Sequence, residues 1–307
     1  NTVKNLTIKN SYLKGGNLTG GIAGAVRGGT IENCHNVNTT VATQEGDTGS
    51  LGGIIGQSQA DVIKNCTNSG KVINNGSRKT AQTGGIVGVS SDNTEISNCT
   101  NYGEIYSNEN SGYFIGGICG AFMIKSNKEG TINNCVNNGK ITCWGVAGGI
   151  VGANWIGTTI KNCSNTSEIK GLGGIGGIVG QLGAEDNGLQ FSTVTECYNS
   201  GNIICIGTNE DSGKLGGIVG GIKKTGREDV ISKCYNKGKI ENCEESVGAI
   251  LGFDSNTEKK VKLSSLYYLN TVGIGAIDGT DDEANKVQSV ETDIKTYEEF
   301  IEWIKDK

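Results

Sequence analysis

The sequence predicts an all-β fold: a right-handed parallel β-helix, or β-solenoid, of about eight coils with a short capping helix at the C-terminus. Three observations lead to this prediction. A Gly-Gly-Ile-x-Gly block recurs about every 32 residues, a motif with one cysteine and one asparagine follows it, and no repeat contains an amphipathic run of helix length. We expect residues 1–270 to form the solenoid and residues 271–307 to form a C-terminal cap.

The glycine block occurs in seven full copies and one degenerate copy, Gly248–Gly252. The first glycines of consecutive blocks are separated by 32, 32, 32, 32, 28, 40 and 32 residues. If coils of this length stack with like residues over like, the third position of the block forms one internal column. That position is isoleucine in all eight copies: Ile22, Ile54, Ile86, Ile118, Ile150, Ile178, Ile218 and Ile250.

The second motif reads apolar-x-x-Cys-x-Asn, as in Ile31–Asn36. It recurs with cysteine at Cys34, Cys66, Cys99, Cys135, Cys163, Cys197 and Cys234, and with asparagine at Asn36, Asn68, Asn101, Asn137, Asn165, Asn199 and Asn236. Each repeat thus carries three short apolar segments separated by glycine or asparagine, which is typical of short strands. A β-propeller is the alternative, but its blades usually need about 40 residues or more and four strands.

The recurring cysteines and asparagines are interpreted as structural. Stacked thiols would point the same way, which suits burial as small apolar groups better than disulfide geometry, although a few cross-coil disulfides remain the alternative. Cys119, Cys143, Cys205 and Cys243 lie off the column and are expected to fill gaps in the core. The asparagines are expected to turn the corners in a left-handed conformation, or to pair amide to amide along the stack.

Composition narrows the functional classes. The chain has 51 glycines and no proline, and its net charge is −5 with lysines and arginines scattered along it. Without a basic stripe, nucleic-acid binding has little support, and no apolar run approaches the roughly 18 residues of a membrane span. We therefore expect neither a nucleic-acid partner nor membrane insertion. No signal peptide is visible and the first residue is not Met, as expected of a mature or shortened chain.

Catalytic motifs are absent. The single histidine, His35, has no partner histidine, and neither H-E-x-x-H nor G-x-S-x-G occurs. We expect no enzymatic activity, no cofactor and no metal site. A weak calcium site at Asp278–Glu283 is the alternative to solvated charge. The acidic groups do not recur at one repeat position; they are Glu185-Asp186, Glu210-Asp211, Glu228-Asp229, Glu244-Glu245 and Asp281-Asp282-Glu283.

Aromatic residues supply the candidate ligand-binding site. Six are concentrated around the fourth and fifth coils: Tyr106, Tyr113, Phe114, Phe122, Trp144 and Trp155. Exposed on one face, they would form a platform for a glycan or for a host or bacterial surface protein. The alternative is that they cover insertions and pack against the outside of the coils.

A short helix is predicted at the end of the chain. Tyr297, Phe300, Ile301 and Ile304 follow helical spacing, and Thr296 with Glu299 resembles a capping box. Such a helix would cover the open end of the solenoid, or it would join a following domain.

The repeats also resemble a known family. Gly84–Gly88 followed by Ile96–Gly103, which reads Ile-x-Asn-Cys-x-Asn-x-Gly, resembles the GLUG repeat of bacterial surface proteins. The resemblance implies an extracellular, cell-surface location and a non-catalytic adhesin or spacer role. Similar repeats occur in some bacterial immunoglobulin A peptidases, where catalysis belongs to a separate zinc domain whose histidine motif this chain lacks.

Three functions follow from these predictions. The first is a stiff, non-catalytic adhesin or ligand-binding module. The second is a carbohydrate-active parallel β-helix enzyme, of the polysaccharide lyase or hydrolase type, which would need acidic residues converging on one face. The third is a purely structural spacer.

Overall fold

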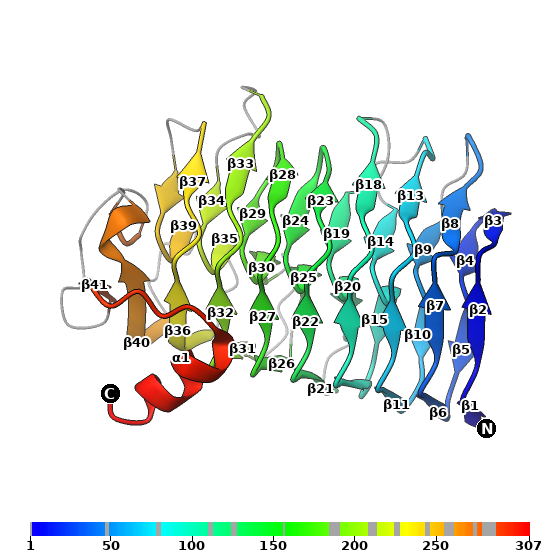
Figure 1. Ribbon diagram of the computed structural model, residues 1–307, viewed down its shortest axis with the longest axis horizontal. Coiled ribbons are helices and arrows are strands. Elements are labelled where there is room, and N and C mark those ends of the chain that lie inside the picture. The colour runs from blue at the N-terminus through cyan, green and yellow to red at the C-terminus, as the bar shows by residue number, and fades with distance from the viewer. Residues whose placement is uncertain are drawn as a thin grey trace.

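The chain forms a parallel β-solenoid whose coils stack along one long axis (Figure 1). The computed structural model describes residues 2–46, 49–77, 81–109, 113–123, 128–155, 157–183, 191–207, 214–223, 228–242, 246–254, 261–272, 275–277 and 287–307. The strands form one 17-stranded sheet and three eight-stranded sheets. Every strand pairing within these residues is parallel, so the predicted parallel β-helix is confirmed.

Two eight-stranded sheets flank the glycine block of each repeat. The β10 sheet contains β5 (Ala23–Arg27), β10 (Ile55–Gln59), β15 (Val87–Ser91), β20 (Cys119–Met123), β25 (Val151–Asn154), β30 (Val179–Leu182), β35 (Val219–Ile222) and β39 (Leu251–Asp254). The β9 sheet contains β4 (Leu18–Gly20), β9 (Ser50–Gly52), β14 (Gln82–Gly84), β19 (Phe114–Gly116), β24 (Val146–Gly148), β29 (Ile175–Gly176), β34 (Leu215–Gly216) and β38 (Val247–Gly248).

The other two sheets contain the cysteine motif or follow it. The β13 sheet contains β3 (Tyr12–Gly15), β8 (Thr40–Thr43), β13 (Val72–Asn74), β18 (Ile105–Ser107), β23 (Ile141–Thr142), β28 (Ile169–Gly171), β33 (Ile203–Cys205) and β37 (Ile240–Glu241). The 17-stranded sheet holds two strands from most coils: β1 (Thr2–Lys4), β2 (Thr7–Lys9), β6 (Thr30–Glu32), β7 (His35–Val37), β11 (Val62–Lys64), β12 (Thr67–Asn68), β16 (Glu95–Ser97), β17 (Thr100–Asn101), β21 (Gly130–Asn133), β22 (Val136–Asn137), β26 (Thr158–Lys161), β27 (Ser164–Asn165), β31 (Thr193–Thr195), β32 (Tyr198–Asn199), β36 (Val230–Asn236), β40 (Lys262–Leu269) and β41 (Val287–Val290).

A full coil has five strands, where the sequence predicted three apolar segments. From one glycine block to the next the chain runs, for example, through β10, β11, β12, β13 and β14. One additional strand arises because the glycine block separates two strands, such as β14 and β15. The other arises at a corner made by a single residue: the residue before each column cysteine is left-handed, with φ near 50° at Asn65, Asn98 and Asn134, and in most coils it divides the apolar segment into two strands. The motif asparagine two residues after the cysteine was the expected left-handed residue, and that part of the prediction was wrong.

The isoleucines of the glycine block form the predicted internal column. Ile54 N–H donates to Ile86 O at 3.0 Å, and Ile86 N–H donates to Ile118 O at 3.1 Å. These three side chains are buried and belong to the main hydrophobic core together with the corresponding residues of later coils. Like residues therefore lie over like, as the constant isoleucine predicted.

The cysteines form a second column in the same core. All seven are buried, and the ten cysteines among the described residues carry no disulfide bond. Each column thiol is directed at backbone carbonyls: Cys135 Sγ lies 3.4 Å from Asn133 O and 3.8 Å from Ile96 O of the preceding coil. Cys119, Cys143 and Cys205 are also buried, as expected, while Cys243 lies outside the described residues.

The asparagines form an amide ladder that runs through six of the coils. Asn68 Nδ2 donates to Asn101 Oδ1 at 2.8 Å, and Asn101 Nδ2 donates to Asn137 Oδ1 at 2.9 Å. The ladder continues through Asn165 and Asn199 to Asn236. Each amide also closes its own turn: Asn101 Nδ2 donates to Gly103 O at 2.9 Å, and Gly103 N–H donates back to Asn101 Oδ1 at 3.2 Å. The predicted ladder is therefore present, and it satisfies buried polar groups that would otherwise lack partners.

Replacing Asn101 by leucine is expected to lower the free energy of unfolding by about 2–4 kcal/mol. The change removes four hydrogen bonds of a fully buried amide and leaves polar atoms of Asn68, Gly103 and Asn137 with fewer partners. Chemical denaturation followed by circular dichroism measures the effect. Asn138→Leu is the matched control, because Asn138 is exposed and should change stability by less than about 1 kcal/mol. Equal effects of the two substitutions would contradict a stabilising ladder.

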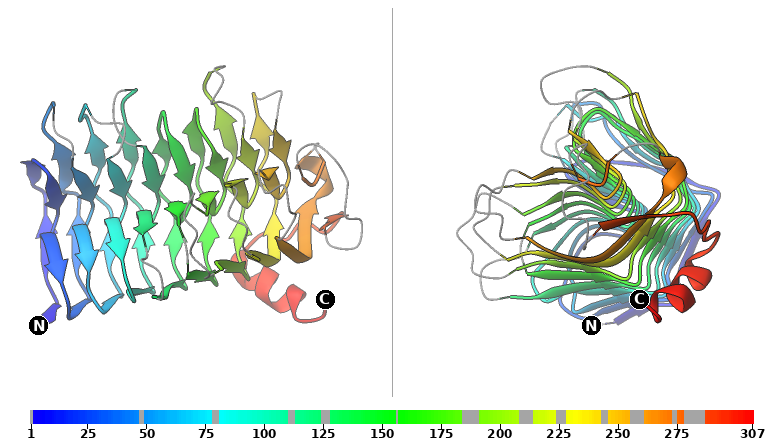
Figure 2. Two further views of the ribbon diagram at one scale, coloured as in Figure 1. Left: turned by 180° about the vertical axis from the view of Figure 1, so that it is seen from behind. Right: turned by 90° about the vertical axis from the view of Figure 1, so that its left-hand side faces the viewer.

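The C-terminal segment forms the predicted helix, α1 (Tyr297–Ile304), capped as expected. Thr296 Oγ1 accepts a hydrogen bond from Glu299 N–H at 3.2 Å, and Glu299 Oε2 accepts one from Lys295 N–H at 2.9 Å. The predicted position over the open end of the solenoid is wrong. The helix lies along the outer flank of the last coils, as the end-on view of Figure 2 shows. The last coil is instead followed by the 3₁₀ turn η1 (Asn270–Val272) and by β41, which pairs with β40.

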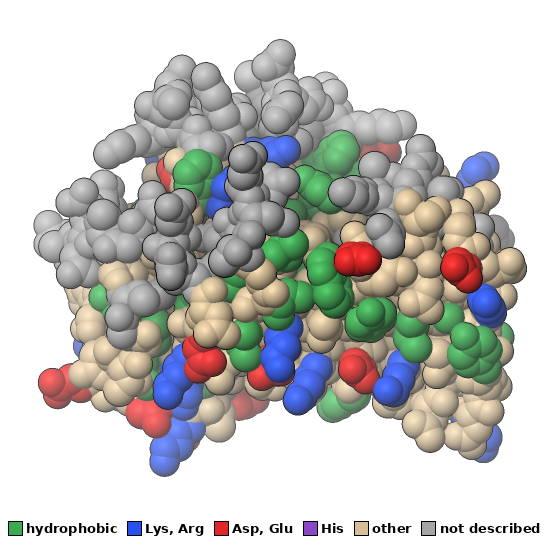
Figure 3. Space-filling view, turned by 90° about the horizontal axis from the view of Figure 1, so that it is seen from above, with side chains coloured by type: hydrophobic (Ala, Val, Ile, Leu, Met, Phe, Trp, Pro, Cys, Tyr) green, Lys and Arg blue, Asp and Glu red, His purple; other side chains and the backbone are tan. Residues whose placement is uncertain are grey.

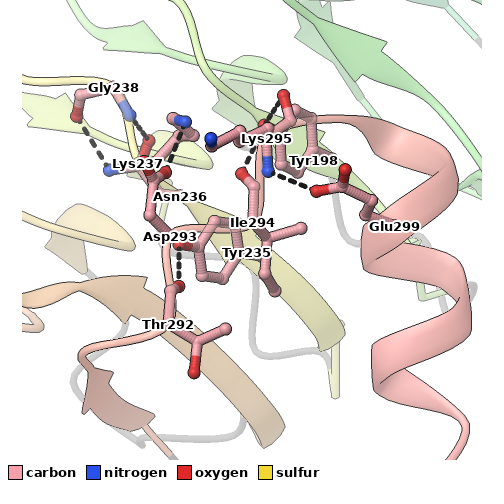
Figure 4. Close-up of polar contacts among 10 residues, drawn as sticks. All are labelled: Tyr198, Tyr235, Asn236, Lys237, Gly238, Thr292, Asp293, Ile294, Lys295 and Glu299. Carbon is pink, nitrogen blue, oxygen red and sulfur yellow. Dashed lines mark hydrogen bonds and ion pairs between the residues drawn. The ribbon is translucent and has the colours of Figure 1, made fainter.

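Tyrosines that follow the column cysteines hold this segment on the flank (Figure 4). Tyr198 donates its hydroxyl to Ile294 O and Lys295 O, both at 2.9 Å, and Tyr235 donates to Thr292 O at 2.9 Å. Phe300 of α1 is fully buried against the two tyrosine rings. The amphipathic pattern thus predicted which face of the helix is buried, but not that this face packs against the flank of the last coils.

Candidate functional site

The six predicted aromatic residues do not form one platform. Phe122 is fully buried in the core, where it lies in register with Asn154 of the next coil. It is adjacent to Trp155, whose backbone N–H donates to Phe122 O at 3.1 Å, so the expected proximity of these two residues is correct. Exposure of Phe122 was the wrong expectation, because its position on β20 faces the solenoid interior.

A second group packs where the β9 and β10 sheets adjoin. Phe114 is buried with Val89 and Val146 in a small apolar cluster, and Trp155 is partly buried against that cluster. Tyr113 is 41% exposed and packs edge-on against Phe114, with ring centroids 4.6 Å apart. This group fits the alternative interpretation, in which aromatic side chains pack against the outside of the coils.

The remaining two residues, Tyr106 and Trp144, meet on the outer face of the β13 sheet. Their ring centroids are 6.2 Å apart, and the rings meet edge-to-face at 77°. Tyr106 pairs in register with Thr142, which places Trp144 just beyond the neighbouring strand β23. Trp144 is 36% exposed. The edge contact with Tyr106 fixes the orientation of the indole ring.

The sequence analysis missed a third aromatic residue on this face, Tyr102, which is 57% exposed. It precedes β18 in the run Tyr102-Gly103-Glu104-Ile105-Tyr106, whose side chains alternate between outside and inside. Gly103 and Ile105 are buried, so the other three residues face outward. The alternation itself was the signal that could have identified Tyr102, since two tyrosines and a glutamate occupy every second position.

Charged side chains lie between these aromatic residues. Lys71, Glu104 and Lys140 directly precede residues that pair across β13, β18 and β23, so they are neighbours on adjacent coils. Lys71 Nζ lies 3.0 Å from Glu104 Oε2. Figure 3 shows lysine or arginine and acidic side chains alternating along this side of the molecule beside hydrophobic ones. We call Lys71, Tyr102, Glu104, Tyr106, Lys140 and Trp144 the outer aromatic face.

The row of charges continues into the next coil. Glu168 lies 3.2 Å from Lys170 and 3.9 Å from Lys140, again between side-chain charged atoms. Asn138 and Thr166 lie on the same side, where Thr166 Oγ1 donates to Asn138 Oδ1 at 2.6 Å. Exposed ion pairs of this kind contribute little to stability, so this row is free to serve another purpose.

His35 and the acidic pairs occupy structural positions where they are described. The ring nitrogens of His35 lie 2.8 Å from Thr67 Oγ1 and 2.8 Å from Asn33 Oδ1, and the residue begins β7, directly after the corner, rather than forming a turn. Asp229 is buried and accepts a hydrogen bond from Ser192 N–H at 2.7 Å, while Glu228 pairs with Lys262. The other acidic clusters, including Asp278–Glu283, lie outside the described residues.

Two further searches cover the described part of the chain. It contains no group of three or more histidine, cysteine, aspartate or glutamate side chains placed to hold a metal ion. None of its helices has the length and apolar character that crossing a bilayer requires.

Asn154 is a buried polar residue outside any ladder. Its side chain is fully buried between Phe122 and Leu182 of the adjacent coils, and neither Oδ1 nor Nδ2 has a hydrogen-bond partner among the described residues. An unsatisfied amide in the core costs stability, because it has lost its hydrogen bonds to water. Nothing in the glycine block or the cysteine motif accounts for an asparagine at this position.

Replacing Asn154 by leucine, the residue that the next coil has at this position, is therefore expected to raise the free energy of unfolding by about 1–3 kcal/mol. The measurement is the same denaturation experiment as for Asn101→Leu, and the two asparagine-to-leucine changes should act in opposite directions. A loss of stability in the Asn154 variant would show that its amide has a partner in solution, such as an internal water molecule.

A family model and a solved structure are similar to this chain. The family model described as the GLUG motif matches residues 47–73, which include the block Gly52–Gly56 and the motif around Cys66. Among solved structures, one described as a putative immunoglobulin A1 protease from Bacteroides ovatus has a TM-score of 0.45 and 21% sequence identity, over 82% of this chain and 68% of that one. No curated protein is significantly similar in sequence.

Proposed function

The chain is a GLUG-repeat protein, and from this premise we propose that it is a non-catalytic, adhesin-like binding module on the surface of a bacterium. The observation that supports the proposal most directly is the contrast between the inside and the outside of the coil. Inside, the recurring isoleucines and thiols pack in the core, and the ladder asparagines hydrogen-bond to one another. Outside, the outer aromatic face carries exposed rings and charges that the fold does not need.

The mechanism is geometric. Coils about 4.8 Å apart build a stiff rod, which holds side chains in fixed rows at the spacing of the strands. A ligand that contacts several coils therefore meets a rigid surface, and little entropy is lost on binding. Several modules on one cell would add avidity to a weak single contact.

The proposal is tested by binding and by location. Antibody labelling of intact cells that produce the parent protein should detect the chain without permeabilisation. The purified chain should bind at least one member of a printed glycan array or of a panel of host matrix proteins. If it binds neither, the spacer role is favoured over the adhesin. Release of reducing ends from any polysaccharide during the same incubation would overturn the non-catalytic assignment and support a carbohydrate-active enzyme.

A further inference from the structure

We infer that the outer aromatic face binds an uncharged glycan chain, an inference that rests on the proposed binding function and identifies the site and the ligand class. Two rings are open to solvent on this face: Tyr102 is 57% exposed and Trp144 is 36% exposed. Sugar rings present apolar C–H faces that stack on aromatic rings, and their hydroxyl groups need donors and acceptors at the edge of the stack.

The rings are held in place before any ligand arrives. Trp144 packs edge-on against Tyr106 of the adjacent coil, and Tyr106 lies in β18, whose backbone is bonded on both sides. Tyr102 N–H donates to Asn68 O at 2.7 Å, which fixes the backbone at that corner. Rings that are already ordered lose little rotational freedom when a sugar stacks on them, so even a small contact can give measurable affinity.

Polar groups lie where the hydroxyls of a stacked sugar would reach. Glu104 stands between Tyr102 and Tyr106 along the chain, and its carboxylate offers acceptors. Lys71, 3.0 Å from that carboxylate, and Lys140 in the next coil offer donors. Along the coil of β18 the face thus presents Tyr102, Glu104 and Tyr106, with the lysines on the two neighbouring coils.

The same alternation argues against a protein partner. The centre of a protein–protein interface is a contiguous apolar patch from which lysine and glutamate are depleted. Here Glu104, which is paired with Lys71, lies between Tyr102 and Tyr106 along the chain, and both side chains of the ion pair are about half exposed. A flat protein surface covering this face would have to bury that pair, at a cost that the two rings would not offset.

A polyanionic ligand fits no better, because the row reads lysine, glutamate, lysine, glutamate from Lys71 to Glu168. Each positive group has a negative neighbour, so there is no stripe of one sign to attract a charged polymer. An uncharged glycan needs hydrogen-bond donors and acceptors but no net charge, and this row supplies donors and acceptors whose charges balance.

The test uses the complete chain in native gels that contain soluble neutral polysaccharides, namely a mannan, a xylan, a β-glucan and a galactan. Binding appears as retarded migration, and the hit is quantified by calorimetry with oligosaccharides of the same polymer. Tyr102→Ala and Trp144→Ala are the site variants. Tyr12→Ala is the matched control, because Tyr12 is 65% exposed and lies on β3 of the same sheet, three strands before β18.

The expected result is retardation by at least one neutral polysaccharide, with affinity lowered about tenfold or more in each site variant and unchanged in the control. The binding should persist when NaCl is raised from about 50 to about 500 mM, since no counterions are released. Circular dichroism and thermal midpoints confirm that each variant folds. Should Trp144→Ala fail to fold, Tyr102→Ala decides alone.

Three outcomes would overturn the inference. Glycan binding that is equal in the site variants and the wild type would place the site elsewhere and leave the proposed function intact. Binding only to a host protein, lost in the site variants, would replace the ligand class. Absence of retardation by every polysaccharide, together with an unreactive glycan array and matrix panel, would remove both the inference and the proposed function.

Discussion

Raising the pH from about 8 to about 10.5 is expected to unfold this protein, because its buried thiols cannot ionise inside the core. In an unfolded chain a thiol has a pKa of about 8.5. Above that pH the unfolded chain loses protons that the folded chain retains, so the unfolded state is favoured. Above about pH 8.5, each such thiol lowers the free energy of unfolding by about 1.4 kcal/mol per pH unit. Below that pH the thiol is protonated in both states, and the full stability of the folded protein is present.

Two sets of thiols contribute. Burial raises the pKa of Cys119 and Cys143, which lie off the column, to about 12. Within the column the pKa is raised further, because a thiolate would sit in an apolar core beside other thiols. The column thiols with a strongly raised pKa are Cys66, Cys99, Cys135, Cys163 and Cys197. A hydrogen bond with the neighbouring thiol is the largest cause for Cys66 and Cys99. Burial is the largest cause for the other three. Such a number of coupled thiols makes the alkaline transition unusually steep.

The measurement is a series of denaturation curves between pH 7 and 10.5 in the presence of a reductant. Iodoacetamide labelling at pH 8 supplies a second readout, since the buried thiols should stay unlabelled until the chain unfolds. Cys143→Ala removes one isolated thiol and should flatten the dependence of stability on pH by about 1.4 kcal/mol per pH unit. Rapid labelling of the native protein, or stability independent of pH up to 10.5, would contradict the buried, protonated column.

The inside of the solenoid could be predicted from the sequence because the inward-facing positions have the same neighbours in every coil. Ile54, Ile86 and Ile118 have identical neighbours above and below, so one side chain fits all positions, and the repeat is visible by inspection. The same holds for the column thiols and the asparagine amides. The corner residue was assigned wrongly because asparagine occurs on both sides of the cysteine, as at Asn98 and Asn101, and composition alone cannot tell which one has positive φ.

The outside could be predicted only in part, since outward positions have no common neighbour. Tyr106 and Trp144 meet because β18 and β23 are in register, whereas Phe122 lies in the same region of sequence and faces the core. Counting aromatic residues along the chain could not distinguish outward-facing from inward-facing ones. The alternation of side chains between the two faces of each strand would have distinguished them. The docking of α1 was also encoded, by Tyr198, Tyr235 and Tyr267 at one repeat position, but the pattern concerned three coils only.

The second glycine of each block has a role that a search for flexible turns would not suggest. At Gly85 the backbone φ is not in the left-handed region, so conformational freedom is not the reason for glycine. Glycine is required because there is no room for a side chain at this position. A Cβ atom on Gly85 would lie 2.2 Å from Gly117 O of the next coil and 2.4 Å from Cγ of Asn101, which is the ladder amide of its own coil. The backbone at Gly85 therefore lies close to both the next coil and the asparagine ladder.

Replacing Gly85 by alanine is therefore expected to lower the free energy of unfolding by more than about 3 kcal/mol, or to prevent folding, because neither contact can relax. The carbonyl of Gly117 belongs to the sheet backbone, and Asn101 is fixed by its hydrogen bonds on both sides. Gly174→Ala is the matched control: a Cβ there would meet nothing closer than 3.5 Å, so stability should change by less than about 1 kcal/mol. Soluble yield and the denaturation midpoint measure both variants. If Gly85→Ala were as stable as Gly174→Ala, the coils could not be packed as closely as the isoleucine and asparagine columns require.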